Sequence, residues 1–173
     1  MDPTSNTRVQ LFYCKNCIGG ASHTFTTTMG QAAHVSLIVM EVGGADLTAP
    51  YDTGAGTIGS STTPSSGVTG TRAQGDEIII GVVGTGDNVN NGTLNAGTNF
   101  TIPTNGTQKN FNDYVLGIEY QIVSAAGTGA ATFTISNDTW GCIAATFKAA
   151  AAVSALFNKS QFGRQAAKRA SFY

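Results

Sequence analysis

The sequence has little charge and no long apolar run. Only 11% of its 173 residues are charged, less than half of the share that is usual in soluble domains. No segment reaches the roughly 18 apolar residues that a membrane-spanning helix needs, and the opening "MDPTSNTRVQ" has no apolar stretch of signal-peptide type. The net charge of −1 provides no general attraction to nucleic acid or to an anionic membrane. We therefore expect no nucleic-acid partner and no membrane partner.

Cysteine is also scarce, and its count is odd: Cys14, Cys17 and Cys142. An odd count argues against a disulfide framework, so the fold is expected to depend on packing. Cys14 and Cys17, together with His23 and His34, are four side chains of the kinds that bind zinc, but their spacing matches no compact zinc module. We expect two ordinary thiols at Cys14 and Cys17, a core residue at Cys142, and no metal or cofactor.

In place of charge the chain has abundant glycine, threonine and serine, including 22 glycines. Between Val9 and Phe147 the apolar residues follow a period of two, which is typical of strands. The expected strands are 9–15, 22–29, 34–42, 66–71, 76–84, 99–103, 113–123, 130–135 and 140–149, and the segments 113–123 and 130–135 are expected to pair as a hairpin. Eight or nine short strands with regular turns predict an all-β fold, an antiparallel β-sandwich of jelly-roll type with a C-terminal extension.

This pattern divides the chain into an N-terminal arm (1–8), the β-sandwich domain (9–148) and an alanine-rich, basic C-terminal arm (149–173). The C-terminal arm contains four basic residues and no acidic one, too few and too scattered for a nucleic-acid patch. Val153, Leu156 and Phe157 recur at helical spacing, which favours a short helix. The arm is either a free tail or an assembly arm, and its assembly residues would be Leu156, Phe157, Phe162 and Phe172.

The alternation also predicts a core. Its expected members are apolar residues of the strands: Phe12, Leu37, Val39, Ile78, Ile80, Val82, Ile118, Tyr120, Phe133, Ile143 and Phe147.

One stretch resembles an active-site motif. Asp52-Thr53-Gly54-Ala55 has the signature of aspartic proteases, but Pro50 precedes it and the chain has only one such triplet. We interpret residues 49–56 as a turn that begins at the proline. There is no Gly-x-Ser-x-Gly elbow, and the pattern does not select a facing carboxylate pair among Glu41, Glu77 and Glu119. The sequence therefore predicts no catalytic residues and no enzyme.

Three aromatic residues are candidates for contact with a glycan: Trp140, Tyr51 and Tyr114. Aromatic rings stack on sugars, although a tryptophan that opens a strand is more often an anchor in the core or at its rim.

Three segments together suggest a family: "GGASHTFTTTMGQAAHVSLIVMEVGGAD" (19–46), "DEIIIGVVGTG" (76–86) and "VLGIEYQIVSAAGTGAATFTISNDTWGCIAATFKA" (115–149). Over residues 9–148 the chain resembles a β-sandwich domain that recurs in phage virion proteins and in large secreted bacterial surface proteins. The resemblance implies surface display, adhesion or particle decoration, with no established active site. Domains of this kind usually have further strands before the one at 9–15. An unpaired sheet edge invites strand donation from a neighbouring subunit, so we expect an oligomer.

We therefore expect a non-enzymatic structural protein of a virus particle, such as a phage capsid decoration, head fibre, minor capsid or tail component. Its location would be the virion, and its partners would be other copies of itself and other virion or surface proteins. The alternative is a secreted carbohydrate-binding or adhesive module at the cell surface, with glycans as partners.

Overall fold

The computed structural model describes residues 8–28, 35–86, 94–110 and 114–151. Within these ranges the protein is all-β, has no helix, and pairs its strands in an antiparallel manner. The strands are β1 (Tyr51–Ser61), β2 (Asp76–Thr85), β3 (Asn95–Ala96), β4 (Thr107–Asn110), β5 (Tyr114–Ser124), β6 (Phe133–Thr134) and β7 (Asp138–Lys148).

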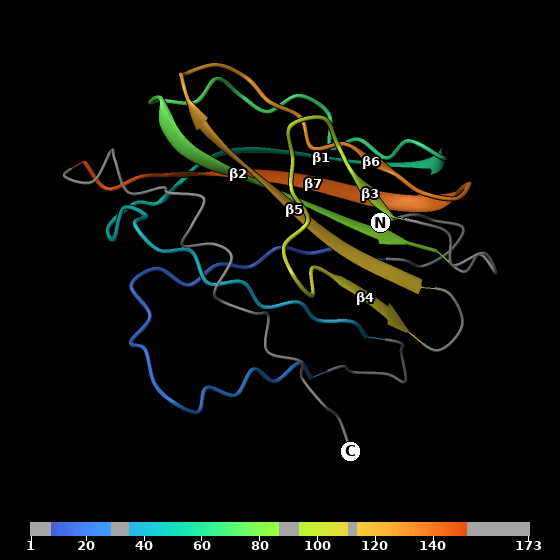
Figure 1. Ribbon diagram of the computed structural model, residues 1–173, viewed down its shortest axis with the longest axis horizontal. Coiled ribbons are helices and arrows are strands. Elements are labelled where there is room, and N and C mark those ends of the chain that lie inside the picture. Colours follow the sequence, from blue (N-terminus) through green and yellow to red (C-terminus); the bar gives the residue numbers. More distant parts are fainter. Residues whose placement is uncertain (1–7, 29–34, 87–93, 111–113, 152–173) are drawn as a thin grey trace.

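Five strands form one sheet in the order β1-β7-β2-β5-β4, and β3 pairs with β6 in a separate ribbon. β2 lies at the centre of the sheet (Figure 1) and is buried along nearly its whole length. Its sequence "DEIIIGVVGT" has apolar residues in both registers, as a strand covered on both faces requires.

The sheet has two covered faces with separate cores. On the first, which we call the ribbon face, Ile79, Val83, Cys142 and Ala144 pack against Phe133, Ile135 and Trp140. On the second, which we call the N-terminal face, the buried residues are Ile78, Ile80, Val82, Ile118, Ala145 and Phe147. Figure 1 shows these covers on opposite sides of the sheet, with the N-terminal segments in blue and cyan.

The cover of the ribbon face is hydrogen-bonded to itself. The segment 62–72 runs beside 127–135, with Ser66 N donating to Ala131 O at 2.9 Å and Phe133 N donating to Pro64 O at 2.9 Å. The segment therefore lies in an extended, partly paired layer, although the expected strand at 66–71 does not form and only a single bridge joins Ser65 to Thr132.

The cover of the N-terminal face comes from segments expected to be strands. Val9, Leu11, Ile38, Met40 and Val42 pack against this face, yet the described parts of 9–15, 22–29 and 34–42 contain no strand. The two-residue period divides the side chains of 35–42 into two sets, but it did not identify the inward set, which is Ile38, Met40 and Val42 and not the expected Leu37 and Val39. It did not determine pairing, because side chains can contact a sheet face without any ladder hydrogen bond.

The interpretation of residues 49–56 as a turn is wrong, because this stretch opens the eleven-residue strand β1. Pro50 does not interrupt the sheet since it precedes the first strand residue, a position that tolerates proline. Its carbonyl accepts a hydrogen bond from Lys148 N at 2.7 Å.

The strands expected at 76–84, 113–123 and 140–149 are confirmed as β2, β5 and β7. The expected hairpin is wrong: β5 pairs with β2 and β4, while the segment 130–135 contributes only the short β6, paired with β3. The segment 99–103 contributes one bridge, Thr101 to Tyr120. The all-β, antiparallel expectation is confirmed. The sheets are open, so the jelly-roll sandwich remains a prediction.

The core expectation is confirmed at Ile78, Ile80, Val82, Ile118, Phe133 and Phe147. It is wrong at Phe12, whose side chain is 82% exposed, because its segment turns Leu11 toward the sheet and Phe12 away from it. The remaining four are only half-buried: Leu37, Val39, Tyr120 and Ile143.

Ile78 provides a test of this core. It is fully buried near the start of β2, the central strand of the sheet, so we expect Ile78→Ala to lower the free energy of unfolding by about 2–5 kcal/mol through lost contacts and a residual cavity. Urea denaturation measures the change. The matched control is Ile18→Ala, because Ile18 is 89% exposed and its truncation should cost about 0.5 kcal/mol or less. Equal losses from the two variants would contradict the described core.

Candidate functional site

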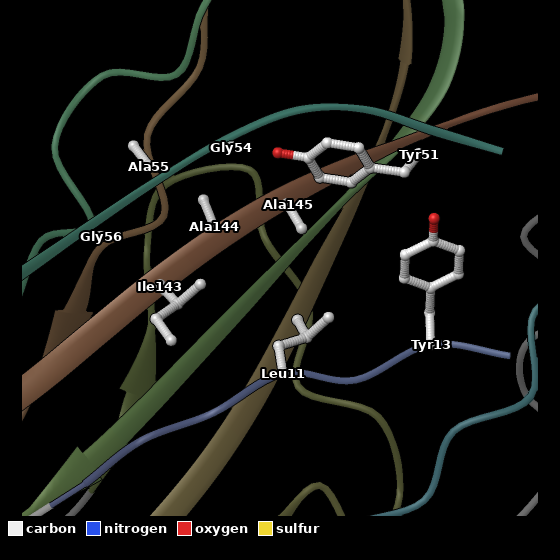
Figure 2. Close-up of a pocket in the computed structure, with 9 residues that line it drawn as sticks. All are labelled: Leu11, Tyr13, Tyr51, Gly54, Ala55, Gly56, Ile143, Ala144 and Ala145. Carbon is white, nitrogen blue, oxygen red and sulfur yellow. The ribbon is translucent and has the colours of Figure 1, made fainter. Parts of the chain in front are cut away.

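A shallow apolar groove lies where β1 and β7 meet the N-terminal segment (Figure 2). Its volume is about 460 Å³, and its lining comes from the three elements in turn: Leu11 and Tyr13; Tyr51, Gly54, Ala55 and Gly56; Ile143, Ala144 and Ala145.

The groove exists because β1 presents glycine where a side chain would otherwise stand. In the β1–β7 register Gly54 lies opposite Ala145 and Gly56 opposite Ile143, so both glycines face the side on which Ala145 and Phe147 are packed. The N-terminal segment covers β7 and β2 on this side, and the glycines leave the adjacent strip of β1 bare. A Cβ at Gly54 would stand 2.7 Å from the carbonyl oxygen of Ala144, which excludes any other residue there without a shift of the backbone.

An aromatic cluster closes one end of the groove. The rings of Tyr13 and Tyr51 are stacked at a centroid distance of 6.2 Å, and the ring of Phe147 meets Tyr13 edge-on at 5.5 Å and Tyr51 at 6.2 Å. Phe147 is buried, whereas Tyr13 and Tyr51 are 53% and 44% exposed. The two tyrosines are therefore anchored on the core and still available to a ligand.

The outer side of β1 is an unpaired sheet edge. β1 is the last strand of the sheet, and no backbone hydrogen bond within the described ranges joins its outer side to another segment. The neighbouring segment 62–73 contacts β1 through side chains instead: the Thr57 hydroxyl donates to Ser65 O, and Asp52 Oδ2 accepts from Ala73 N. Ile58, farther along this strand, is 49% exposed.

The chemistry of the groove is that of a peptide site. The only polar side-chain groups in its lining are the two tyrosine hydroxyls, so it has few groups to satisfy the many hydroxyls of a sugar. An extended peptide needs backbone partners along an edge and shallow apolar positions for alternate side chains. The β1 edge and its glycine-floored groove supply both.

On the ribbon side, β1 brings two carboxyl groups together. A register shift between Tyr51 and Gly54 marks a bulge, and there Asp52 approaches Glu77 of β2. Glu77 is fully buried, and neither of its oxygens makes a hydrogen bond of good geometry. Burial, and then the neighbouring Asp52, raise the pKa of Glu77, against the lowering effect of the Thr146 hydroxyl. The Asp-Thr-Gly aspartate thus meets a second carboxyl, but one on β2, from which β1 is separated by β7.

A second buried carboxyl fastens the ribbon to the sheet. Glu119 of β5 is fully buried and accepts hydrogen bonds from Gly97 N at 2.8 Å and Thr132 N at 3.2 Å, one on each side of the β3–β6 pair. Burial raises the pKa of Glu119 to about 7, even though both hydrogen bonds act to lower it. Gly81 makes room for this side chain, since a Cβ there would lie 2.9 Å from Glu119 Cγ.

The cysteines divide into a bonded pair and a buried thiol. Cys14 and Cys17 form a disulfide, so the expectation of ordinary thiols is wrong. The reason is the turn at Lys15–Asn16: Asn16 takes the left-handed conformation with φ 53°, which asparagine tolerates, and the two Cα atoms lie 6.0 Å apart. Cys142 is core, as expected, and burial followed by the charge of Glu119 raises its pKa to about 12.

The structure does not bring the three candidate glycan residues together. Trp140 is buried on the ribbon face and donates from Nε1 to Ser61 Oγ at 3.1 Å, so its assignment to a surface contact is wrong. Tyr51 is exposed in the groove at the other end of the β1–β7 ladder. Tyr114 is half-buried at the start of β5, across the sheet. The expected assembly residues lie outside the described residues: Leu156, Phe157, Phe162 and Phe172.

Sequence reasoning missed Tyr13, Leu11 and the Asp52–Glu77 pair. The sequence did contain one signal for the groove, namely the alternation of Gly54 and Gly56 in a strand that begins with an aromatic residue. The pairing of Asp52 with Glu77 had no such signal, because it depends on the order of the strands in the sheet, in which only β7 separates β1 from β2.

Within the ranges that the structure describes, no three or more His, Cys, Asp and Glu side chains gather to hold a metal ion. The same ranges contain no helix whose length and hydropathy would allow it to cross a membrane.

The buried Glu119 makes a prediction about pH. The glutamate pKa is 4.5 in an unfolded chain, whereas the pKa of Glu119 in the folded protein is about 7. Between pH 4.5 and pH 7 the unfolded state therefore binds fewer protons than the folded state. The free energy of unfolding should therefore fall as pH rises through this window, by about 3 kcal/mol for a shift of this size. Urea denaturation across the window measures the slope of the free energy of unfolding against pH.

Two variants test the assignment of this slope to Glu119. Glu119→Gln should remove most of the slope and leave the part due to Glu77, while Glu41→Gln, at an exposed site, should leave the slope unchanged. A Glu119→Gln slope equal to that of the unaltered protein would contradict the assignment.

Comparison with protein-family models, with curated proteins and with solved structures found no match. The groove, the free edge and the buried carboxyl groups of this chain are therefore interpreted from their own chemistry.

Proposed function

We propose that this chain is a non-enzymatic structural protein of a virus particle, acting through oligomeric assembly as a phage capsid decoration, head fibre, minor capsid or tail component. The observation on which the proposal depends is the unpaired edge of β1 beside an apolar, glycine-floored groove. Such an edge is a template for pairing with another chain, and proteins that remain monomeric usually block it.

The described edge lacks two of the usual blocks, charged side chains along the strand and an internal proline, and the segment 62–73 contacts it at Asp52 and Thr57 without backbone pairing. In β1 the only charged residue is Asp52, which lies at the bulge and is hydrogen-bonded to Ala73 N. The remaining nine residues from Thr53 to Ser61 are uncharged, so a neighbouring strand would meet no like charge.

Three further features support a role in a particle. The low charge and the abundance of threonine, serine and glycine suit a packed assembly, and the resemblance to virion domains over residues 9–148 points the same way. The Cys14–Cys17 disulfide would persist outside a reducing cytosol. The proposed location is accordingly the virion, with other copies and other virion proteins as partners.

We propose the β-sandwich as the architecture of this unit. It is supported by the partly paired layer of 62–72, 127–135 and the β3–β6 ribbon that packs on one face of the larger sheet. Jelly-roll topology would follow if the N-terminal segments gained their strand partners in the assembled state.

The alternative is a secreted carbohydrate-binding or adhesive module at the cell surface. The exposed, stacked pair of Tyr13 and Tyr51 favours it, because such rings form platforms for sugars. The scarcity of polar side chains beside the pair disfavours it. Binding on a glycan array that Tyr51→Ala abolishes would favour this alternative over assembly.

The edge can be tested with a charge. Ile58 is half-exposed on β1, so Ile58→Lys should change the free energy of unfolding by only about 0.5 kcal/mol, while a lysine on the edge opposes strand addition. We expect mass photometry of the purified full-length chain to show oligomers, and Ile58→Lys to weaken self-association by about tenfold or more, equivalent to roughly 1.4 kcal/mol.

Ile18→Lys is the matched control, since Ile18 is exposed and lies outside β1, directly after Cys17, so its substitution should leave association unchanged. A folded chain that stays monomeric at all accessible concentrations would overturn the proposed assembly.

A further inference from the structure

We propose that the groove beside β1 receives the C-terminal segment 152–173 of a second copy of this chain, which pairs with β1 as an added strand. This inference rests on the proposed function, because it names the partner of the same edge. Four observations support it: where the described chain ends, the side chains of the segment, the distribution of charge, and the direction of the strands.

The described chain ends beside the groove. Phe147 of β7 lies opposite Tyr51, and the chain then follows Gly44 and Ala45, with a bridge from Ala149 to Ala45 and Ala150 N donating to Gly44 O at 3.0 Å. The described chain therefore ends, at residue 151, near the aromatic end of the groove. Fully extended, a segment of the length of 152–173 spans roughly 70 Å, which is enough to reach an adjacent subunit.

The segment has side chains that suit the groove. It begins "AVSALF" at Ala152, and in an extended conformation Val153, Ala155 and Phe157 project to one side because strands have a period of two. All three are apolar, as is most of the lining that they would meet over Gly54 and Gly56. The lining offers these side chains apolar contacts, with hydroxyls only on its two tyrosines.

The charges of the two parts are complementary. The segment contains four of the nine basic residues, Lys159, Arg164, Lys168 and Arg169, and none of the ten acidic ones. Residues 1–151 therefore contain five basic and ten acidic residues, a net charge of −5. Opposite charge favours encounter between the segment of one copy and the body of another.

Strand direction favours a second copy over the chain's own segment. β7 runs antiparallel to β1 and ends beside the first residue of β1, so its own continuation, returning along β1, would run parallel to it. It would also have to pass the residues 44–46 that bond to 148–150. A segment from another subunit is free to approach in the antiparallel direction, which is the more common pairing and needs no crossover connection.

Photo-crosslinking in the full-length chain tests the occupant. One sample of the protein has p-benzoylphenylalanine in place of Phe157, and it is mixed with an equal amount of the unaltered chain labelled with ¹⁵N. After irradiation, mass spectrometry identifies the crosslinked peptides and shows from their isotopes whether they come from one chain or two. We expect crosslinks from the light segment to heavy peptides that contain the groove residues Leu11, Tyr13, Tyr51 or Ile143.

The control variants act on the floor of the groove. A Cβ at Gly56 would meet only ordinary contacts at 3.5 Å, so Gly56→Val should preserve the fold while filling the floor. It should lower the yield of two-chain crosslinks about tenfold. Gly19→Val is the matched control, because Gly19 is exposed with no atom near its added Cβ, and it should leave the yield unchanged.

Each other outcome overturns the inference in a distinguishable way. Crosslinks to the groove from the same chain alone would assign the groove to the chain's own segment. Crosslinks elsewhere, or none, in a chain that mass photometry shows to be oligomeric would remove the segment and leave the proposed assembly standing. A monomeric chain would remove both.

Discussion

The structure depends on the burial of β2 on both of its faces. Isoleucine and valine side chains project from both faces of this strand. A sheet with one face exposed to solvent would leave half of them in water, so each face needs its own cover. The two covers are built differently. The ribbon face is covered by a layer that bonds to itself and is fastened by Glu119, whereas the described segments on the N-terminal face form no strand and pack on the sheet with apolar side chains.

The incomplete reach of the N-terminal cover produces the candidate site. Leu11 and Tyr13 extend as far as β7, and beyond them the face of β1 has glycine in place of larger side chains. The groove, the exposed tyrosines and the open edge are therefore consequences of one arrangement. Because that arrangement offers backbone partners and apolar contacts together, it suits an extended peptide better than a sugar or a reacting substrate.

Sequence patterns predicted some features and missed others for physical reasons. The long apolar runs of β2, β5 and β7 were recognisable because burial on two faces leaves little freedom in composition. β1 was missed because Pro50 and three glycines are typical of turns, although an edge strand tolerates both. In 35–42 both alternating sets of side chains are apolar, so alternation could not show that Ile38, Met40 and Val42 would face the sheet in place of Leu37 and Val39. It also gives no information on strand pairing. The meeting of Asp52 with Glu77 depends on strand order, which no local pattern encodes.

Trp140 was assigned both a core and a surface role, and the core role holds because Gly59 leaves space for its indole.

The two glycines of the groove floor differ in how freely they can change during evolution. At Gly54 the backbone oxygen of Ala144 stands where a side chain would begin, so the pairing of β1 with β7 itself forbids substitution. At Gly56 the space above the strand is open to a small side chain. Related chains that diverge in partner preference would therefore do so at Gly56, by altering how large a residue the floor admits, while Gly54 stays unchanged.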